Sequence, residues 1–273
     1  MNWHDLLTAG FMRQAFFAAT LAGIACSAVG VLIVIMRISF IGVCLSHAAF
    51  AGALLGVLLG LPPLPLSLAA GIGAAGLLGP LARRGRLSPD ATMGILFSVT
   101  LGVSFLILGL LPGSRAEGLQ FLWGSVLSVG RQDILLLSGI VFLTVVLTVV
   151  FFKEIHATVF SQELAAASGL PAGTVLYGVL MVAGAAVVGS LKAVGGLLVF
   201  SLMINPAAAA YQCSYRLSRI FLLAAVFGVV SAWAGIAVSC AWNLPTGACI
   251  ILASSAIFLL ALWLSPKRRR VPR

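Results

Sequence analysis

Long stretches without a charged residue are the feature that most constrains how this chain can fold. Residues 38–82 contain no Asp, Glu, Lys or Arg, and neither do residues 220–266. Each stretch is about twice the roughly 20 residues that a helix needs to cross a bilayer. The whole chain of 273 residues is 62% hydrophobic and 8% charged, far more apolar than a soluble domain. The sequence therefore predicts an integral membrane protein.

Charges, prolines and turn residues divide the chain into nine expected membrane spans. The expected fold class is all-α, one polytopic transmembrane helical bundle over residues 1–273. Ser88, Pro89 and Asp90 form an N-cap, a first-turn proline and a first-turn acid, which together predict a helix start. Eight or ten spans are alternatives, because the turn at Lys192 and the short apolar segment 119–129 each allow two interpretations. The expected spans are 14–36, 38–60, 66–82, 89–111, 134–152, 174–191, 193–210, 220–242 and 248–266.

The distribution of basic residues predicts the orientation of the chain. Twelve of the sixteen Lys and Arg residues fall on one side of the nine-span arrangement. Because cytoplasmic segments carry the excess of Lys and Arg, the N-terminus is expected outside and the C-terminus in the cytoplasm. Residues 266–273 form a basic cytoplasmic tail, whose expected contact is anionic lipid and not nucleic acid.

His47 and Cys44 are the candidate functional side chains within the spans. An ionisable group at membrane depth is costly and usually faces a polar cavity or a partner. Cys44 lies three residues before His47, so both occupy one face of a helix. Imidazole and thiolate suit zinc and other late transition metals. The alternative is a neutral histidine bonded to a backbone carbonyl, with Cys44 as a small buried hydrophobe.

A row of glycines follows His47 on the same predicted helix. Gly52, Gly56 and Gly60 recur at every fourth position, which lets another backbone approach one face of the helix. Packing within the chain and a dimer face remain alternatives. Farther along, Ser161 is placed to cap a short helix that has Glu163 in its first turn and stops at Gly169.

No pattern in the sequence indicates catalysis or nucleotide binding by this chain. The motif from Gly71 to Gly76 has dinucleotide-type spacing but lies inside an apolar span, where it is a packing face. No Walker A motif occurs, and the six acidic residues fall at span ends or in loops. An enzyme is therefore not expected, and neither is a carrier that relies on buried carboxylates.

Six blocks in order resemble the membrane permeases of bacterial ABC importers for zinc, manganese and iron. The resemblance covers nearly the whole chain and so outweighs any single motif. The blocks are RISFIG with LSHAA at 37–49, DATMGI at 90–95, LWGSVL at 122–127, Phe160 with ELA at 163–165 and GLP at 169–171, VGGLLV at 194–199 with PAA at 206–208, and LPTG at 244–247.

The resemblance implies a homodimer in the bacterial cytoplasmic membrane whose two copies line one pathway for a divalent metal ion. Zinc is the first candidate, with manganese or iron as others. The implied partners are two ATPase subunits, which bind the ATP, and an extracytoplasmic metal-binding protein. No cofactor is expected on this chain. The region 158–171 becomes a coupling helix that docks on the ATPase, through Ser161, Glu163, Leu164, Ala165 and Gly169, and His47 lies on the translocation path.

Two positions depart from the family pattern. Val43 stands where the family usually has an aspartate, and Asn243 stands where an aspartate often precedes LPTG. Loss of a hard oxygen ligand makes the site less suited to manganese. Two copies of His47 and Cys44 could instead form a tetrahedral site. A metal chelate as cargo, a secondary transporter and a non-transporting scaffold remain alternatives.

Overall fold

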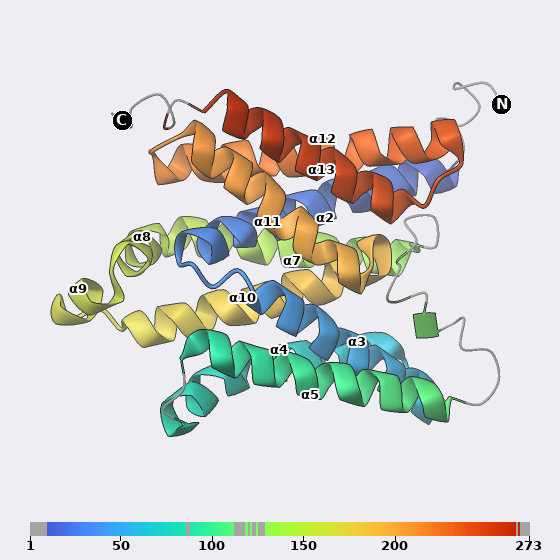
Figure 1. Cartoon of the computed structure of the whole chain (residues 1–273), viewed down its shortest axis with the longest axis horizontal. Helices are drawn as coiled ribbons and strands as arrows, with labels where there is room; N and C mark the ends of the chain where they lie inside the picture. The colour runs from blue at the N-terminus through green and yellow to red at the C-terminus, as the bar shows by residue number, and fades with distance from the viewer. Residues whose placement is uncertain are drawn as a thin grey trace.

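The computed structural model describes residues 10–85, 88–111, 118–119, 121, 124, 129–265 and 267. All secondary-structure elements in these residues are helices, and Figure 1 shows the long ones in three tiers: α12 and α13 in one, α7 and α10 in the next, α3 to α5 in the third. The helices are α2 (Gly10–Ile35), α3 (Ile41–Leu59), α4 (Pro63–Gly85), α5 (Pro89–Leu110), α7 (Arg131–Val150), α8 (Phe152–Phe160), α9 (Gln162–Ala167), α10 (Ala172–Val194), α11 (Gly196–Cys213), α12 (Leu217–Trp242) and α13 (Thr246–Trp263).

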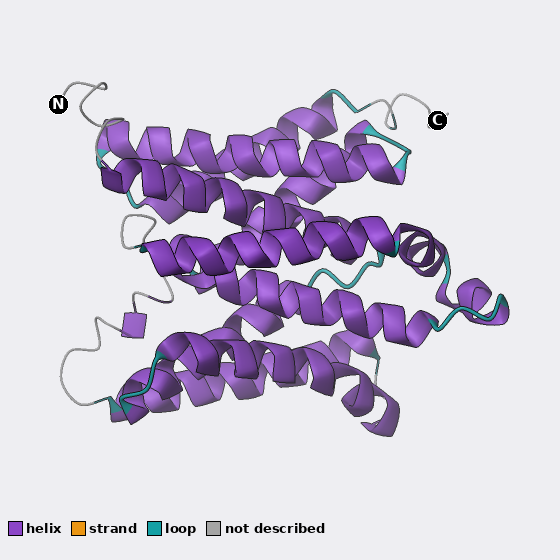
Figure 2. Ribbon diagram, turned by 180° about the vertical axis from the view of Figure 1, so that it is seen from behind, coloured by secondary structure: helices purple, strands orange, loops and turns teal. Residues whose placement is uncertain are grey.

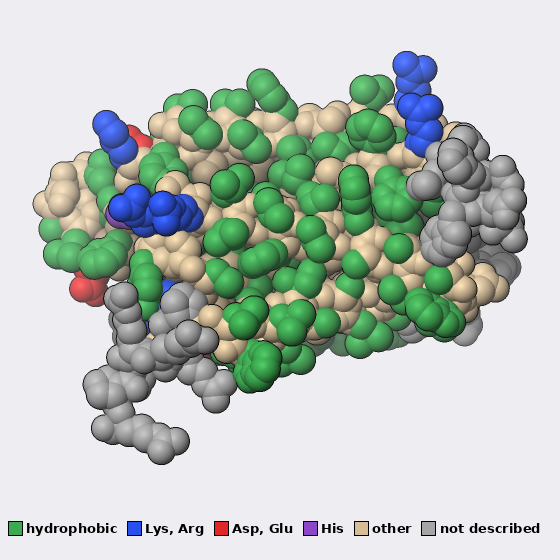
Figure 3. Space-filling view, turned by 90° about the horizontal axis from the view of Figure 1, so that it is seen from above, with side chains coloured by type: hydrophobic (Ala, Val, Ile, Leu, Met, Phe, Trp, Pro, Cys, Tyr) green, Lys and Arg blue, Asp and Glu red, His purple; other side chains and the backbone are tan. Residues whose placement is uncertain are grey.

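The expectation of a polytopic helical bundle is confirmed. Eight of the described helices are long and apolar enough to cross a membrane, and α11 contains a shorter apolar stretch, Leu198–Cys213. Figure 3 shows a surface covered by hydrophobic side chains, with Lys and Arg side chains toward its two ends. This distribution places apolar atoms against lipid and charges at the two membrane surfaces.

Two predicted helix boundaries were wrong: the turn between α10 and α11, and the end of the span that precedes α8. The turn between α10 and α11 falls at Gly195, whose φ is 96°, and not at Lys192. Lysine is a good helix former, whereas glycine adopts positive φ without a steric cost. The expected span 134–152 was followed by a connection from Lys153, but the chain bends at Phe151 and residues Phe152–Phe160 form α8. Most of the short apolar segment 119–129 and of the tail 266–273 lies outside the described residues.

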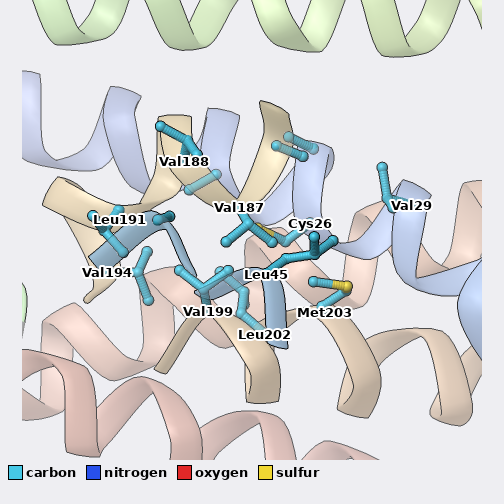
Figure 4. Close-up of a cluster of buried hydrophobic side chains, with 14 of the residues drawn as sticks. Cys26, Val29, Leu45, Val187, Val188, Leu191, Val194, Val199, Leu202 and Met203 are labelled. Carbon is cyan, nitrogen blue, oxygen red and sulfur yellow. The ribbon is translucent and has the colours of Figure 1, made fainter. Parts of the chain in front are cut away.

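Helix α2 is the centre of the bundle, in contact with α7, α10, α11 and α12. About two-thirds of its membrane-spanning stretch is buried, compared with 17% for α5 and for α7. Side chains from α2, α3, α10 and α11 meet in the core that Figure 4 shows, among them Cys26, Leu45, Val187 and Met203. The Cys26 thiol also donates a hydrogen bond of 3.2 Å to the Ser190 hydroxyl on α10.

Small residues allow α2 to lie this close to its neighbours. A Cβ at Gly23 would lie 2.9 Å from the backbone of Gly228 on α12, and one at Gly30 would overlap the carbonyl of Met203 on α11. Lipid tails are as apolar as leucine, so membrane helices associate mainly through such van der Waals contact and through interhelical hydrogen bonds. Asn205 of α11 supplies bonds of that second kind, with its side-chain amide 3.0 Å from the hydroxyls of Ser254 and Ser255 on α13.

Lys267 is the described part of the basic tail, and it lies over two aromatic rings. Its ammonium nitrogen is 3.6 Å from the ring centroid of Tyr211 and 4.8 Å from that of Tyr215. Burial lowers the pKa of Lys267, while the nearby Cys213 acts in the opposite direction. The cation–π contacts hold the start of the tail against the end of α11.

Gly30→Leu is expected to destabilise the protein, because the added side chain must displace the backbone of α11. We expect a loss of about 1–3 kcal/mol, typical of overpacking, and a lower unfolding midpoint for the purified protein in detergent. Gly102→Leu on α5 is the matched control, since a Cβ there meets nothing within 4 Å. Equal unfolding midpoints for the two variants would contradict the assigned role of Gly30.

Candidate functional site

The connection between α2 and α3 brings the start of α3 into the interior of the bundle. Figures 1 and 2 show residues 36–40 running inward from the end of α2 before α3 begins. Arg37 adopts a left-handed conformation with φ 58°, and the Ile38 N–H donates a 3.1 Å hydrogen bond to the Ile33 carbonyl. This is the arrangement of a Schellman cap, with arginine at the position that glycine usually occupies. The first turns of α3 are therefore surrounded by protein.

His47 and Cys44 are both buried on α3, where α5 packs against it. The His47 side chain is 6% exposed, and its Nδ1 atom has no hydrogen-bond partner. The His47 ring lies edge-on to the ring of Phe97 on α5, with 5.0 Å between centroids. The Cys44 thiol donates a 3.0 Å hydrogen bond to the carbonyl of Met93, one turn before Phe97. A buried imidazole with a vacant nitrogen is chemically suited to accept a metal ion.

One copy of the chain offers an incomplete metal site. Within the described residues, no group of three or more His, Cys, Asp or Glu side chains could hold a metal ion. Val43 is half-buried beside Cys44 and supplies no ligand atom. Asn243 is exposed at the C-terminal end of α12 and caps it in a left-handed conformation, with φ 52°. The structure therefore does not bring Asn243 into the His47 region.

The glycine row on α3 faces α4 of the same chain. A Cβ at Gly52 would lie 2.7 Å from the Cβ of Ala70, and one at Gly56 would lie 2.7 Å from the Cα of Pro63. Gly60 ends α3 with φ 65°, and its own Cβ position is open. Gly52 and Gly56 thus serve contact between α3 and α4, and Gly60 serves a turn.

The segment from α8 to α9 protrudes at one end of the bundle, as Figure 1 shows. Ser161 accepts a 3.3 Å hydrogen bond from the Leu164 N–H and so caps α9, with Glu163 in the first turn. Gly169 follows α9 with φ 81°. Ala165 lies on the buried face of α9, whereas the Leu164 side chain is 61% exposed. The short helix and its cap therefore lie where the sequence predicted them.

Sequence reasoning missed Phe97 and noted Phe160 only as part of a family block, without expecting a role for its side chain. Phe160 is 82% exposed beside a hollow of about 320 Å³, which it lines with His156, Leu164 and Ser168 among others. Phe97 lies on a different helix from His47, fifty positions away. The sequence could have pointed to Phe160, because a phenylalanine beside charged residues in a polar interval is unusual. Nothing in the sequence marks Phe97, which is one of many apolar residues in its span.

This architecture, with eight or nine apolar helices around a buried histidine and a small protruding helix, defines a multi-pass membrane permease. The model of the family described as "ABC 3 transport family" matches residues 8–265. The chain belongs to this family, and the resemblance found in its sequence is confirmed.

Relatives and solved structures agree with this assignment. The manganese transport system membrane protein MntC of Halalkalibacterium halodurans is 30% identical, over 97% of this chain and 90% of its own length. The manganese import system permease protein ScaB of Streptococcus gordonii is 28% identical, over 96% and 94%. A chain of PsaBC from Streptococcus pneumoniae, solved in complex with a Fab, is 27% identical with a TM-score of 0.88, over 98% and 96%. A second structure, an inward-facing ABC transporter, shares the fold at 16% identity, with a TM-score of 0.74 over 93% and 86%.

Ser161→Ala is expected to loosen α9, because the Leu164 N–H loses its side-chain acceptor. Loss of an N-cap costs about 0.5–2 kcal/mol, so amides of α9 should exchange with deuterium faster. Ser168→Ala is the matched control, since the Ser168 hydroxyl bonds only the Leu164 carbonyl from the other end of the helix. Hydrogen exchange followed by mass spectrometry gives the comparison. The same exchange rate in both variants would exclude Ser161 as the cap.

Proposed function

We propose that this chain is the permease of an ATP-driven importer and carries a divalent transition-metal ion across the membrane. The observation that supports this most directly is the buried His47 imidazole, with a vacant Nδ1, inside a chain that matches the ABC 3 transport family along nearly its whole length. Transport proceeds by alternating access, with ATP hydrolysed on separate partner chains.

The translocation pathway is proposed to form between two copies of the chain. Each copy contributes Cys44 and His47, and no third ligand lies near them in the described residues. Zinc and related ions prefer four ligands, so two copies supply a complete set of two sulfur and two nitrogen atoms. Before Cys44 can bind a metal ion, its thiol must break the hydrogen bond that it donates to the Met93 carbonyl.

Two ions are candidates, and a different observation favours each. The relatives MntC and ScaB are manganese systems by name, which favours manganese. The ligand types favour zinc, because thiolate and imidazole are softer than the oxygen ligands that suit manganese, and Val43 offers no oxygen. The choice between the two ions is tested by measuring how strongly unlabelled zinc and unlabelled manganese each inhibit the uptake of the other ion.

The protruding segment is proposed as the contact with the ATPase. Phe160 and Leu164 present large apolar surface at the end of the bundle where the membrane surface is expected. Exposed apolar side chains on a capped, rigid helix are typical of a docking surface. Partners of the assembly are then two ATPase subunits on this side and an extracytoplasmic metal-binding protein on the other.

The orientation follows the positive-inside rule, with the N-terminus outside and the C-terminus in the cytoplasm. A fluorescent protein fused after Arg273 should therefore fluoresce, and alkaline phosphatase fused at the same position should be inactive. An active phosphatase fusion would reverse the proposed orientation and would move α9 away from the ATPase side.

The permease reconstituted alone is expected to move no metal ion, and uptake should begin when the ATPase, ATP and the binding protein are added. His47→Ala and Cys44→Ala should each lower manganese or zinc uptake by about tenfold or more, since each substitution, present in both copies, removes two of the four ligands of the shared site. Cys240→Ala is the control, because this thiol is exposed at the end of α12. Radioisotope uptake into proteoliposomes measures all four proteins.

Three outcomes would redirect the proposal. Uptake by the purified chain alone under a proton gradient would show a secondary carrier. ATP-dependent uptake of a metal chelate but not of the free ion would keep the importer and change its cargo. Wild-type uptake in Cys44→Ala would remove the thiolate from the site while leaving His47 in place.

A further inference from the structure

The first three turns of α5 cover both candidate ligands on α3. The Met93 carbonyl accepts the hydrogen bond of Cys44, and the Phe97 ring lies edge-on to His47 at an interplanar angle of 80°. Met93 and Phe97 are four residues apart, and residues at this spacing share one face of a helix. A single helical face therefore closes over Cys44 and His47 together.

Phe40 holds Phe97 from the other side. The rings of Phe40 and Phe97 have centroids 5.5 Å apart and an interplanar angle of 72°. Phe40 belongs to the inward-running connection before α3 and is 40% exposed. Edge-to-face geometry is the preferred arrangement of aromatic pairs. Phe97 thus sits between two rings at the margin of the protein, held by contacts that are individually weak.

The arrangement leaves His47 with an unmet bonding capacity. Its Nδ1 is buried and has no hydrogen-bond partner. A buried polar atom without a partner is unfavourable, so an arrangement that lets water or a metal ion reach this nitrogen recovers free energy. The aromatic contacts favour the closed arrangement, and the vacant nitrogen favours an open one. A gate requires two arrangements of similar free energy, and these two opposing contributions are of that kind.

Helix α5 lies at the edge of the bundle. Its substantial contacts are with α3 and α4, and 17% of its membrane-spanning stretch is buried, whereas α2 is enclosed by four helices. Gly94 lies between Met93 and Phe97 on α5, and a Cβ added to it would meet nothing within 4 Å. A rotation of the Phe97 side chain, which is only partly buried against the main core, would uncover His47.

We propose that Phe97 is an aromatic lid over the Cys44–His47 pair and that a metal ion reaches these ligands only when Phe97 leaves His47. The lid rests on the proposed function for the identity of the ion, but its effect on access is independent of the cargo. Phe97 is a positioning residue in this role, since it controls access to the ligands and offers no ligand atom itself.

Access to Cys44 gives a direct test in the assembled transporter. The full-length chain with Ala at Cys26, Cys213, Cys240 and Cys249 keeps one thiol, which is reacted with a small methanethiosulfonate reagent in proteoliposomes. In Phe97→Leu, which has no ring, Cys44 should react about tenfold faster, the shift expected when a contact that favours the closed state is lost. Phe97→Tyr retains a ring and should react at the parent rate.

Phe105→Leu is the matched control, because Phe105 is 56% exposed on the same helix and makes no described contact with His47. Its Cys44 should react at the parent rate. Equal rates in Phe97→Leu and Phe105→Leu would overturn the lid. Phe97→Met is a second ringless variant, and it replaces Phe97→Leu as the test if Phe97→Leu does not elute as the assembled transporter.

Adding manganese or zinc separates the lid from the proposed function. Protection of Cys44 by the ion, with faster reaction in Phe97→Leu, supports both. Faster reaction without protection by either ion supports the lid and contradicts metal binding at Cys44. Protection with unchanged reaction in Phe97→Leu supports metal binding and overturns the lid.

Discussion

Helices in a bilayer gain nothing from moving apolar surface out of water, because lipid tails already surround them. Close contact between backbones therefore has to hold this bundle together, and α2 is where it does so. Because Gly23 has no side chain, the backbone of Gly228 on α12 can pack against it. Gly30 allows the same close contact with the carbonyl of Met203 on α11. Hydrogen bonds such as the one between Cys26 and Ser190 add to that contact. Helices α7, α10, α11 and α12 pack around α2, which forms the centre of the bundle.

The metal-site candidates lie on α3, where the central helices meet the tier that α3 forms with α4 and α5. Helix α3 contacts α10 and α11 on one side and α4 and α5 on the other. Cys44 and His47 are thus fixed by the centre but covered by α5, which has few other neighbours. In the proposed function Cys44 and His47 are the ligands, and the proposed lid on α5 controls access to them. The protruding α9 lies at one end of the same bundle, where a partner can act on it.

The all-α class and the repeated crossing of the membrane could be predicted from the sequence, because charges and prolines interrupt apolar runs in a way that a bilayer enforces. The caps at Ser88 and Ser161 were also predictable, since they depend on residues within one turn. From the sequence, the turn was placed at Lys192 and not at Gly195. A charged residue is a weaker signal of a helix end than a glycine, which can adopt a positive φ. Helix α8 was missed because a bend at Phe151, and not a polar linker, separates it from α7.

By itself the sequence determined that the chain spans the membrane repeatedly, that His47 and Cys44 share a helical face, and that the family is that of metal-importer permeases. These follow from composition, from spacing and from ordered motifs, all of which are local along the chain. Only the tertiary structure decided that Gly52 packs on α4 and that Phe97 covers His47. The physical reason is that side-chain partners across fifty residues depend on how helices cross, and apolar spans of similar composition do not specify their neighbours.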